Sequence, residues 1–542
     1  MFFVDGFGQK TFDEALAEGR IPNISRHLLQ RGVHVESAVA CLPTITYANA
    51  VTFLTGRYPG RHGIVSNKWF EPSTDRFEDY TYIRTYQHVD EDYTAPTIYE
   101  LLPGRQTVSI EAAMRRGCTQ TIDNWATSGL NWFVSNYTGV DCLVTQSFEE
   151  LGSACSWRGR WPDFIMAYFP ASDTIAHRFG PESVEYKRSI SLVDLQIGRI
   201  CENLQAIGMY DHTYLVLVSD HGMASVDPEN SLDIAQLLRD RAGARVWFNH
   251  LTESSADLRA LRECDFAVAM SASRWAAIYP VPGRQTRHTE ELAALTEALR
   301  AYEAPPGGSA SGKSALGGEG ADESPDNART LLPPWLREAV EHPAVELMAC
   351  SFRPGKVHLF TRTGHAVVTR TVNPVERHTV WQQPSSPVFG PEAGLRPASP
   401  LLHPAPEMLA ETESSEASDS RVWLQATART RYPDLVPQIA AMFESERAGT
   451  FVFFAAVGWG FAPSDFAGGH GSTTAEDVRV PMLFAGPGLP AGGTIPTARN
   501  SDVMPTVLEL LGAKPVKPNG DRVDMDGISL LPCSGDRPEV DK

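Results

Sequence analysis

The sequence predicts an α/β fold built on a mostly parallel central sheet flanked by helices. Three short apolar runs are typical of strands buried inside such a sheet: Phe2–Val4, Phe164–Phe169 and Tyr214–Val218. Residues that can bind a metal follow each run, at the edge where open α/β sheets place their functional groups. At 542 residues, 42% of them apolar and 21% charged, the chain can bury a large core together with a smaller domain.

The charge balance argues against several kinds of partner. Lys and Arg number 47 against 66 Asp and Glu, so the formal net charge is −19. Such an acidic surface disfavours binding to a nucleic-acid polymer or to an anionic membrane. An anionic small-molecule substrate would need a local positive charge, for which bound metal is the obvious source.

Targeting and redox signals leave several questions open. No run approaches the roughly 20 apolar residues of a membrane span, and no signal peptide is visible. Because the chain opens directly into the apolar run at Phe2, an upstream start that carries a signal peptide, and hence a periplasmic or secreted location, stays open. The eight cysteines are scattered without a CxxC pair, so no cysteine zinc knuckle is expected. The disulfide and oligomeric states stay undetermined.

The first strand and the first long helix each carry a candidate functional residue. Asp5-Gly6 follows the strand Phe2–Val4, which predicts either a carboxylate at the sheet edge or a simple turn. Farther on, Thr46 opens a helix that Gly56 ends. A hydroxyl on the first turn lies where unpaired N–H groups and the helix dipole favour negative charge, which suits a nucleophile that attacks a phosphate. The alternative is that Thr46 only caps the helix.

Two further strands end in candidate metal ligands. After Phe164–Phe169, Asp173 and His177 stand four residues apart and share a face if the turn is helical, which suits one metal ion. The alternative is an N-cap aspartate beside an unrelated histidine. Tyr214–Val218 leads into Asp220-His221, and two metal-type ligands at the end of one buried strand indicate a metal site more strongly.

The pattern changes after residue 248. We expect a catalytic core formed by residues 1–248 and 431–542, with an insertion or cap at 249–430 that could act as a lid. Within the insertion, residues 305–327 are low in complexity and residues 384–420 are rich in Pro, Ser and Glu, so both tracts are expected to be flexible. Strands in the insertion are expected at Phe266–Met270, Trp275–Tyr279, Val357–Phe360 and Ala366–Val372.

The last part of the chain returns to the α/β pattern. A helix is expected over Asp434–Phe443 and strands over Phe451–Ala456 and Pro481–Ala485, with His470 in a glycine-rich turn between the two strands. A capped helix over Ser501–Leu511 closes the pattern.

Together these motifs resemble the type I phosphodiesterase/nucleotide pyrophosphatase family of the alkaline phosphatase superfamily. Their order and spacing agree over roughly the first 225 and the last 90 residues. The matching segments are VDG at Val4–Gly6, PTxT at Pro43–Thr46, LTGRYPGRHGIVSN at Leu54–Asn67, DxxxH at Asp173–His177, SDHGM at Ser219–Met223, GGHG at Gly468–Gly471, VPMLFAGPG at Val480–Gly488 and DVMPTVLELLG at Asp502–Gly512. The resemblance implies an alkaline-phosphatase-like fold and a hydrolase that acts on a small-molecule phosphate ester or nucleotide.

The resemblance also implies a set of site residues around two zinc ions, or other divalent metals. The two ligand sets would be Asp173, His177 and His470 for one ion, and Asp5, Asp220 and His221 for the other. Thr46 would bind the second ion as the nucleophile and form a phosphothreonine intermediate. Asn67 matches the amide that contacts a nonbridging phosphate oxygen in this family.

The class of phosphate ester stays open at this stage. Ile45, Ala48 and Ala50 depart from the KTFPNH motif that many eukaryotic members carry around the nucleophile. The same site could therefore serve a phosphomonoesterase or a phosphonoacetate-hydrolase-like enzyme. A threonine in place of a serine, and Asn67 in place of an arginine contact, favour the phosphodiesterase or nucleotide pyrophosphatase.

Two aromatic residues follow Asn67 and are candidate substrate contacts. Trp69 and Phe70 would line the pocket beside the phosphate, where an aryl or base leaving group could stack. The alternative is that both rings pack in the core.

Overall fold

The computed structural model describes residues 1–133, 135–158, 160–302, 327–372, 379–382, 417–461, 465–517 and 519–531. The two tracts predicted to be flexible, 305–327 and 384–420, lie outside the described residues except at their ends. Asn327 begins the helix α13 (Asn327–Thr330), and β17 (Ala417–Asp419) precedes the helix α16 (Ser420–Thr427).

A mixed, mostly parallel sheet forms the centre of the fold, which confirms the predicted fold class. Among the described residues its path runs β21-β2-β22-β8-β1-β7-β5-β6, and β23 pairs with β2. In that order the strands are β21 (Arg479–Val480), β2 (Gly32–Val39), β22 (Met482–Ala485), β8 (Leu215–Val218), β1 (Phe2–Val4), β7 (Phe164–Phe169), β5 (Thr107–Ile110), β6 (Gln120–Ile122) and, beside β2, β23 (Gly493–Arg499). The run from β8 to β6 is parallel throughout, so the carboxyl ends of β8, β1 and β7 lie at one edge.

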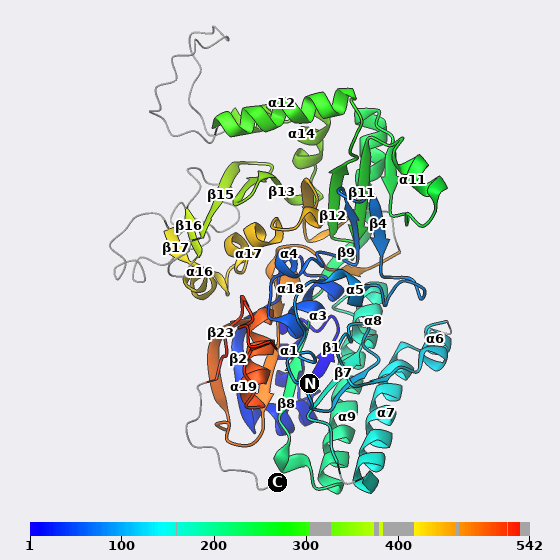
Figure 1. Ribbon diagram of the computed structural model, residues 1–542, viewed down its shortest axis with the longest axis vertical. Helices are drawn as coiled ribbons and strands as arrows, with labels where there is room; N and C mark the ends of the chain where they lie inside the picture. The colour runs from blue at the N-terminus through cyan, green and yellow to red at the C-terminus, as the bar shows by residue number, and fades with distance from the viewer. Residues whose placement is uncertain are drawn as a thin grey trace.

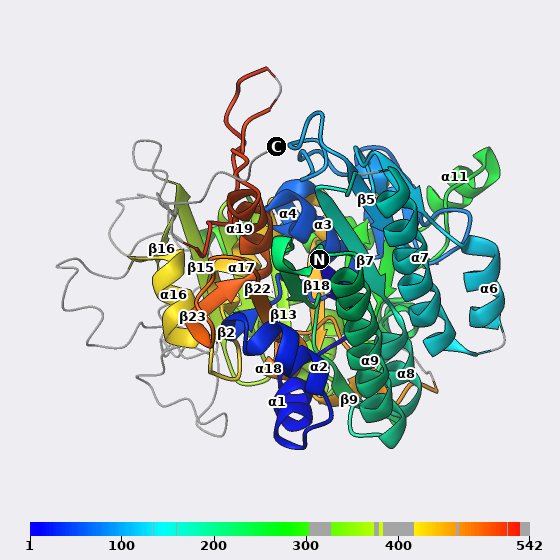
Figure 2. The same cartoon turned by 90° about the horizontal axis from the view of Figure 1, so that it is seen from below.

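Alternation along the strands divides the core between the two faces of this sheet. Phe2 and Val4 pack with side chains from α1 (Gln9–Ala17), α7 (Tyr137–Arg158), α8 (Ala171–Phe179) and α9 (Val184–Ala206). Phe3 packs on the other face with α3 (Thr46–Thr55) and α19 (Val503–Leu510). Successive side chains of a strand point to opposite faces, so a buried run such as this one needs helices on both. Figure 2 shows α7, α8 and α9 packed together, away from α19.

A second, mostly antiparallel sheet lies above the central sheet in the view of Figure 1. Its path in the described residues runs β10 (Val246–Phe248), β11 (Phe266–Ser271), β12 (Trp275–Pro280), β18 (Phe451–Ala455), β13 (Val345–Arg353), β14 (Lys356–Phe360), β15 (His365–Val372), β16 (Thr379–Gln382) and β17. The strands predicted near 266–270, 275–279, 357–360 and 366–372 are all present. β10 and β18 come from outside residues 249–430, so this sheet joins the insertion to the chain on both sides of it.

Helices α12 (Arg287–Tyr302), α14 (Pro334–Glu341) and α17 (Leu435–Met442) accompany the second sheet. The remaining short elements are α2 (Pro22–Ile24), a π-helix at Ser25–Leu29, α4 (Pro59–His62), β3 (Lys68–Glu71), β4 (Arg76–Asp79), α5 (Val89–Asp92), α6 (Trp125–Phe133), β9 (Ala224–Ser231), α10 (Ile234–Leu237), a π-helix at Leu238–Ala242, α11 (Ser255–Leu261), β19 (Gly458–Gly460), β20 (Gly468–Gly469), α18 (Ala475–Val478) and 3-10 turns at Tyr210–His212, Glu446–Ala448 and Asn500–Asp502. Within the part of the chain that the structure describes, no helix combines the length and the apolar character needed to cross a membrane.

Candidate metal centre

Three neighbouring strands deliver their ligands to one point. Asp5 follows β1, Asp220 and His221 follow β8, and Asp173 lies on the first turns of α8, which begins directly after β7. β1 pairs with β7 on one side and with β8 on the other. The carboxyl ends of the three strands therefore meet, and the side chains that follow them converge.

Gly6 makes this convergence possible. Its φ is +66°, and a Cβ at this position would lie 2.9 Å from the Asp173 Cα. Its N–H donates to Asp220 Oδ1 at 3.1 Å. A larger residue would push α8 away from the end of β1, so the glycine after Asp5 sets the spacing between ligands from different strands.

His470 reaches the same point from a distant part of the chain. It follows β20, where a Cβ on Gly468 would lie 2.3 Å from the Ala176 carbonyl oxygen of α8. The missing side chain lets this segment lie directly against α8. The His470 ring is held by its Nδ1, which donates to the Thr44 carbonyl oxygen at 2.8 Å, just before the helix that begins at Thr46.

The ligand atoms form two groups that share His221. Asp5, Asp220 and His221 offer atoms within 4.8 Å of one another, and so do Asp173, His221 and His470. His221 Nε2 lies 3.2 Å from Asp220 Oδ2 and 3.4 Å from Asp5 Oδ1, but also 4.0 Å from Asp173 Oδ1. The second group thus differs from the expected set of Asp173, His177 and His470, since His221 lies within reach of both groups.

His177 remains beside the second group. Its Nε2 is 3.4 Å from Asp173 Oδ1, and its ring centroid is 5.0 Å from that of His470. Its assignment as a ligand, with His221 kept for the other ion, stays a prediction.

The hydrogen bonds of the three histidines prepare them as ligands. Nδ1 of His177, His221 and His470 donates to the carbonyl oxygens of Gly468, Gly222 and Thr44, at 2.9, 2.9 and 2.8 Å. A carbonyl can only accept, so each ring carries a proton on Nδ1. In the neutral form of each ring, the Nε2 lone pair is then turned toward the carboxylates, as a metal requires.

The carboxylates show that the site suits cations. Asp5 Oδ1, Asp173 Oδ1 and Asp220 Oδ2 are buried oxygens without a hydrogen-bond partner among the described residues. Burial raises the pKa of Asp5, and the charges of Asp220 and Asp173 raise this pKa further. Divalent cations between these oxygens and the imidazole nitrogens would relieve the repulsion. The mixed nitrogen and oxygen donors fit zinc and related divalent metals.

Burial also lowers the pKa of His470, and the neighbouring imidazoles of His221 and His177 lower it further. The His470 ring is therefore held neutral, which is the form that binds a metal.

Thr46 lies against the first group. It is the first residue of α3, as predicted, and Gly56 ends the helix with a φ of +65°. Its hydroxyl oxygen lies 3.2 Å from His221 Nε2, within hydrogen-bond distance. Asn67 is held nearby, because its Oδ1 accepts from the N–H of Tyr47, the second residue of α3, at 3.1 Å. That bond leaves the amide nitrogen of Asn67 as a donor.

An open cavity of about 1170 Å³ adjoins these residues, between the central sheet and the second sheet. Its lining includes Thr46, Asn67, Lys68, Asp173, His177, His470 and residues 270–273.

The positions of Trp69 and Phe70 contradict the prediction that both rings line the substrate pocket. Both are fully buried in the core and neither lines the cavity. They lie on β3, whose side chains alternate, and Trp69 Nε1 donates to the Tyr80 hydroxyl at 3.0 Å, away from the cavity. The core-packing alternative is the one that the structure adopts.

Two residues that no sequence pattern singled out support the site. The Tyr168 hydroxyl donates a hydrogen bond to Asp5 Oδ2. Asn49 ties α3 to the preceding segment, with its Nδ2 on the Cys41 carbonyl and its Oδ1 accepting from the Cys41 N–H. A hydroxyl inside the apolar run FIMAYF and a buried amide in an apolar helix were the available signals.

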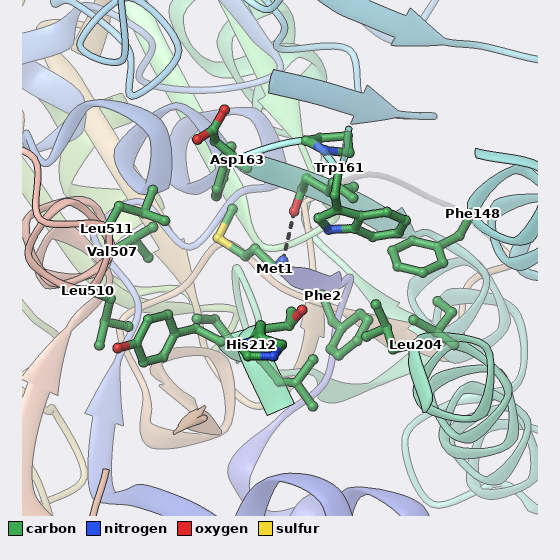
Figure 3. Close-up of a pocket in the computed structure, with 18 residues that line it drawn as sticks. Met1, Phe2, Phe148, Trp161, Asp163, Leu204, His212, Val507, Leu510 and Leu511 are labelled. Carbon is green, nitrogen blue, oxygen red and sulfur yellow. Dashed lines mark hydrogen bonds between the residues drawn. The ribbon is translucent and has the colours of Figure 1, made fainter. Parts of the chain in front are cut away.

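A second cavity lies at the opposite edge of the central sheet (Figure 3). It measures about 120 Å³ and lies where β1, β7 and β8 begin, beside Leu510 and Leu511. Its lining is mainly apolar and includes neither of the metal-type groups found among the described residues. The candidate site is therefore the one at the carboxyl ends of the strands.

Comparison with known proteins defines the class. The model of the type I phosphodiesterase/nucleotide pyrophosphatase family matches residues 1–309, more than half of the chain. The chain belongs to this family of metal-dependent hydrolases.

Curated relatives are similar over part of their length. An uncharacterised pyrophosphatase/phosphodiesterase of Schizosaccharomyces pombe is 28% identical over 41% of this chain and 44% of its own. The bis(5′-adenosyl)-triphosphatase ENPP4 of Bos taurus is 26% identical over 39% and 45%, and the venom phosphodiesterase of Macrovipera lebetinus is 27% identical over 42% and 25%. The chain thus spans less than half the length of these relatives.

Solved structures extend the likeness to the whole fold. Human ectonucleotide pyrophosphatase/phosphodiesterase 5 superposes with a TM-score of 0.54 at 16% identity, over 97% of this chain and 96% of the other. This likeness covers the second sheet as well as the central one.

Proposed function

We propose that the chain is a two-zinc phosphodiesterase or nucleotide pyrophosphatase with Thr46 as its nucleophile. The observation that carries the proposal is the position of the Thr46 hydroxyl. It lies on the first turn of a ten-residue helix, 3.2 Å from His221 Nε2 and beside a group of buried carboxylates. The N–H groups and dipole at this helix end favour negative charge on the hydroxyl oxygen and on a bound phosphate.

Two ligand sets would hold the metals. We assign Asp5, Asp220 and His221, with Thr46, to one zinc, and Asp173, His177 and His470 to the other, although His221 lies near both sets. When bound, the ions would supply positive charge at the phosphate and lower the pKa of the nucleophile and of water.

The residues of the chain then perform a displacement in two steps. Thr46 Oγ1 forms a bond to phosphorus as the ester bond to the leaving group breaks, which produces a phosphothreonine. A water molecule attacks the phosphothreonine in the second step and releases Thr46. Asn67 donates from its amide nitrogen to a nonbridging phosphate oxygen, on which negative charge increases in the transition state.

The substrate would be a diester or a nucleotide pyrophosphate bound in the open cavity. Its volume of about 1170 Å³ accommodates a second substituent on the phosphate. The bovine relative is named a bis(5′-adenosyl)-triphosphatase, and an inactive threonine-to-alanine variant of murine ectonucleotide pyrophosphatase/phosphodiesterase 5 was solved with AMP. Both support a nucleotide substrate here. We also propose that the insertion at 249–430 is a cap that forms one wall of this cavity through residues 270–273.

The test compares Thr46→Ala and Thr46→Ser with the unchanged protein on bis(4-nitrophenyl) phosphate and on 4-nitrophenyl phosphate. The unchanged protein should contain about two equivalents of zinc, prefer the diester and lose activity to a chelator. Thr46→Ala should lose at least about 10³-fold in kcat, because the nucleophile is removed. Thr46→Ser should retain part of the activity. Acid quenching of the unchanged protein during turnover should trap phosphothreonine at Thr46.

The outcomes separate the alternatives. Full activity in Thr46→Ala would remove Thr46 from the reaction. A preference of the unchanged protein for the monoester would identify a phosphomonoesterase with the same site. Protein that binds no zinc and is inert to chelators would contradict the metal centre itself.

A further inference from the structure

The turn between β11 and β12 contacts two segments of the metal centre. The His470 N–H donates to the Ala272 carbonyl oxygen at 2.9 Å, and Ser273 pairs with His470 in an isolated bridge. On the other side, Ser66 Oγ donates to Ser271 Oγ at 2.9 Å, one residue before Asn67. This turn lies outside the segments that carry the family motifs, although the family model, which matches residues 1–309, covers it.

The turn holds a conformation that its residues disfavour. Ala272 and Ser273 have φ values of +55° and +65°, in the left-handed region that non-glycine residues rarely adopt. Such a conformation persists only where surrounding contacts stabilise it. Arg274, the next residue in the chain, makes such a contact.

Arg274 forms a fully buried bidentate ion pair with Asp477. Its Nε and one terminal nitrogen donate to Asp477 Oδ1 and Oδ2, both at 3.0 Å, and its other terminal nitrogen donates to the Ala456 carbonyl at 2.7 Å. Both side chains have an exposed fraction of 0%. Two charges without solvent are costly to bury, so the pair needs the remaining bonds around it to offset that cost.

Asp477 also accepts hydrogen bonds from the segments that carry the metal ligands. Its Oδ1 also accepts from the Ser472 N–H at 3.1 Å, two residues after His470, and its Oδ2 accepts from the Thr474 hydroxyl at 2.9 Å. Its own carbonyl accepts from the Gly222 N–H at 2.8 Å, directly after His221. One carboxylate residue therefore touches the chain next to two ligands from different elements.

We propose that Arg274 and Asp477 are positioning residues for the metal centre, through which the second sheet sets the place of His470. The inference rests on the proposed two-metal site. Neither side chain touches substrate or metal; the pair acts by holding the segment after His470 against the turn before β12. Outer contacts of this kind orient a ligand before the metal binds and so raise metal affinity.

The experiment measures zinc binding to metal-free Asp477→Asn by competition with a chromophoric chelator. Asparagine has nearly the shape of aspartate, but it places a donor against the guanidinium in place of an acceptor. One of the two zinc ions, the one at His470, should bind about 10- to 100-fold more weakly, while the other keeps its affinity.

The chain offers a matched control. Arg499 and Asp434 form a second buried bidentate pair, at 2.6 and 2.8 Å, with exposed fractions of 1% and 0%. No hydrogen bond of Asp434 reaches a ligand segment among the described residues. Asp434→Asn should lower thermal stability to a similar degree and leave both zinc affinities within twofold.

Arg274→Lys serves if Asp477→Asn does not fold, because lysine keeps the charge and loses the bidentate geometry. Either variant with unchanged zinc affinity would overturn the proposal, and so would an equal loss in Asp434→Asn, which would show general destabilisation. Failure of the unchanged protein to bind zinc would instead refute the proposed function on which the inference rests.

Discussion

Removal of the Tyr168 hydroxyl should weaken one metal site by an amount that the structure allows one to work out. Tyr168 donates to Asp5 Oδ2, while Asp5 Oδ1 has no hydrogen-bond partner within the described part of the chain and faces the ligand group. The variant Tyr168→Phe lacks the donor to Asp5 Oδ2. The Asp5 carboxylate is then free to rotate. A hydrogen bond to a charged group contributes about 1.5–3 kcal/mol, which corresponds to roughly 10- to 150-fold in an equilibrium constant.

The same bond lowers the pKa of Asp5, against burial and the charges of Asp220 and Asp173, which raise it. Its loss raises the pKa of Asp5 further, so a proton competes better with the metal. The fall in zinc affinity of Tyr168→Phe should therefore be larger at mildly acidic than at neutral pH.

Chelator competition at both pH values measures the effect, with Tyr279→Phe as the control. The Tyr279 hydroxyl is also buried and donates to the Arg447 carbonyl at 2.6 Å, in the second sheet. Its removal should cost about 1 kcal/mol of stability and leave zinc affinity unchanged. An affinity in Tyr168→Phe within twofold of the unchanged protein at both pH values would refute the reasoning.

Three further substitutions test the positions of single side chains. Asn67→Ala should slow turnover about 100-fold because it removes a donor to phosphate; zinc content by metal analysis should stay normal, and a loss of zinc would contradict this role. Trp69→Ala should lower the free energy of unfolding by about 3–5 kcal/mol, since the ring is fully buried; a rise in KM confined to aryl diesters would instead indicate a substrate contact. Burial raises the pKa of Asp141 from 3.8 to about 8, so the folded protein keeps a proton that the unfolded chain releases. The resulting stabilisation of the folded protein is present below pH 3.8 and is lost as the pH rises to about 8. The free energy of unfolding, measured with urea, should therefore fall less over this pH range in Asp141→Asn than in the unchanged protein. Equal slopes would contradict the raised pKa.

The pattern along the chain determined the elements and most of the candidate ligands. β1, β7 and β8 are continuous apolar runs, and α3 begins at Thr46 and ends at a glycine. Residues close together in the sequence are enough to predict each of these elements. Because the groups that follow parallel strands share one edge of the sheet, Asp5, Asp173 and Asp220 could be expected together before any distance was known.

Only the tertiary structure decided how these groups meet and which neighbours serve them. His470 follows a glycine segment that packs against α8. His221 lies within reach of both ligand groups, near Asp220 in one and Asp173 in the other. Trp69 and the Arg274–Asp477 pair illustrate the same limit, since the ring is buried by residues far away in the chain and the ion pair joins positions 203 residues apart. Helical and strand periodicity depend on near neighbours, whereas burial and ligand distance depend on the packing of distant segments, which no local pattern contains.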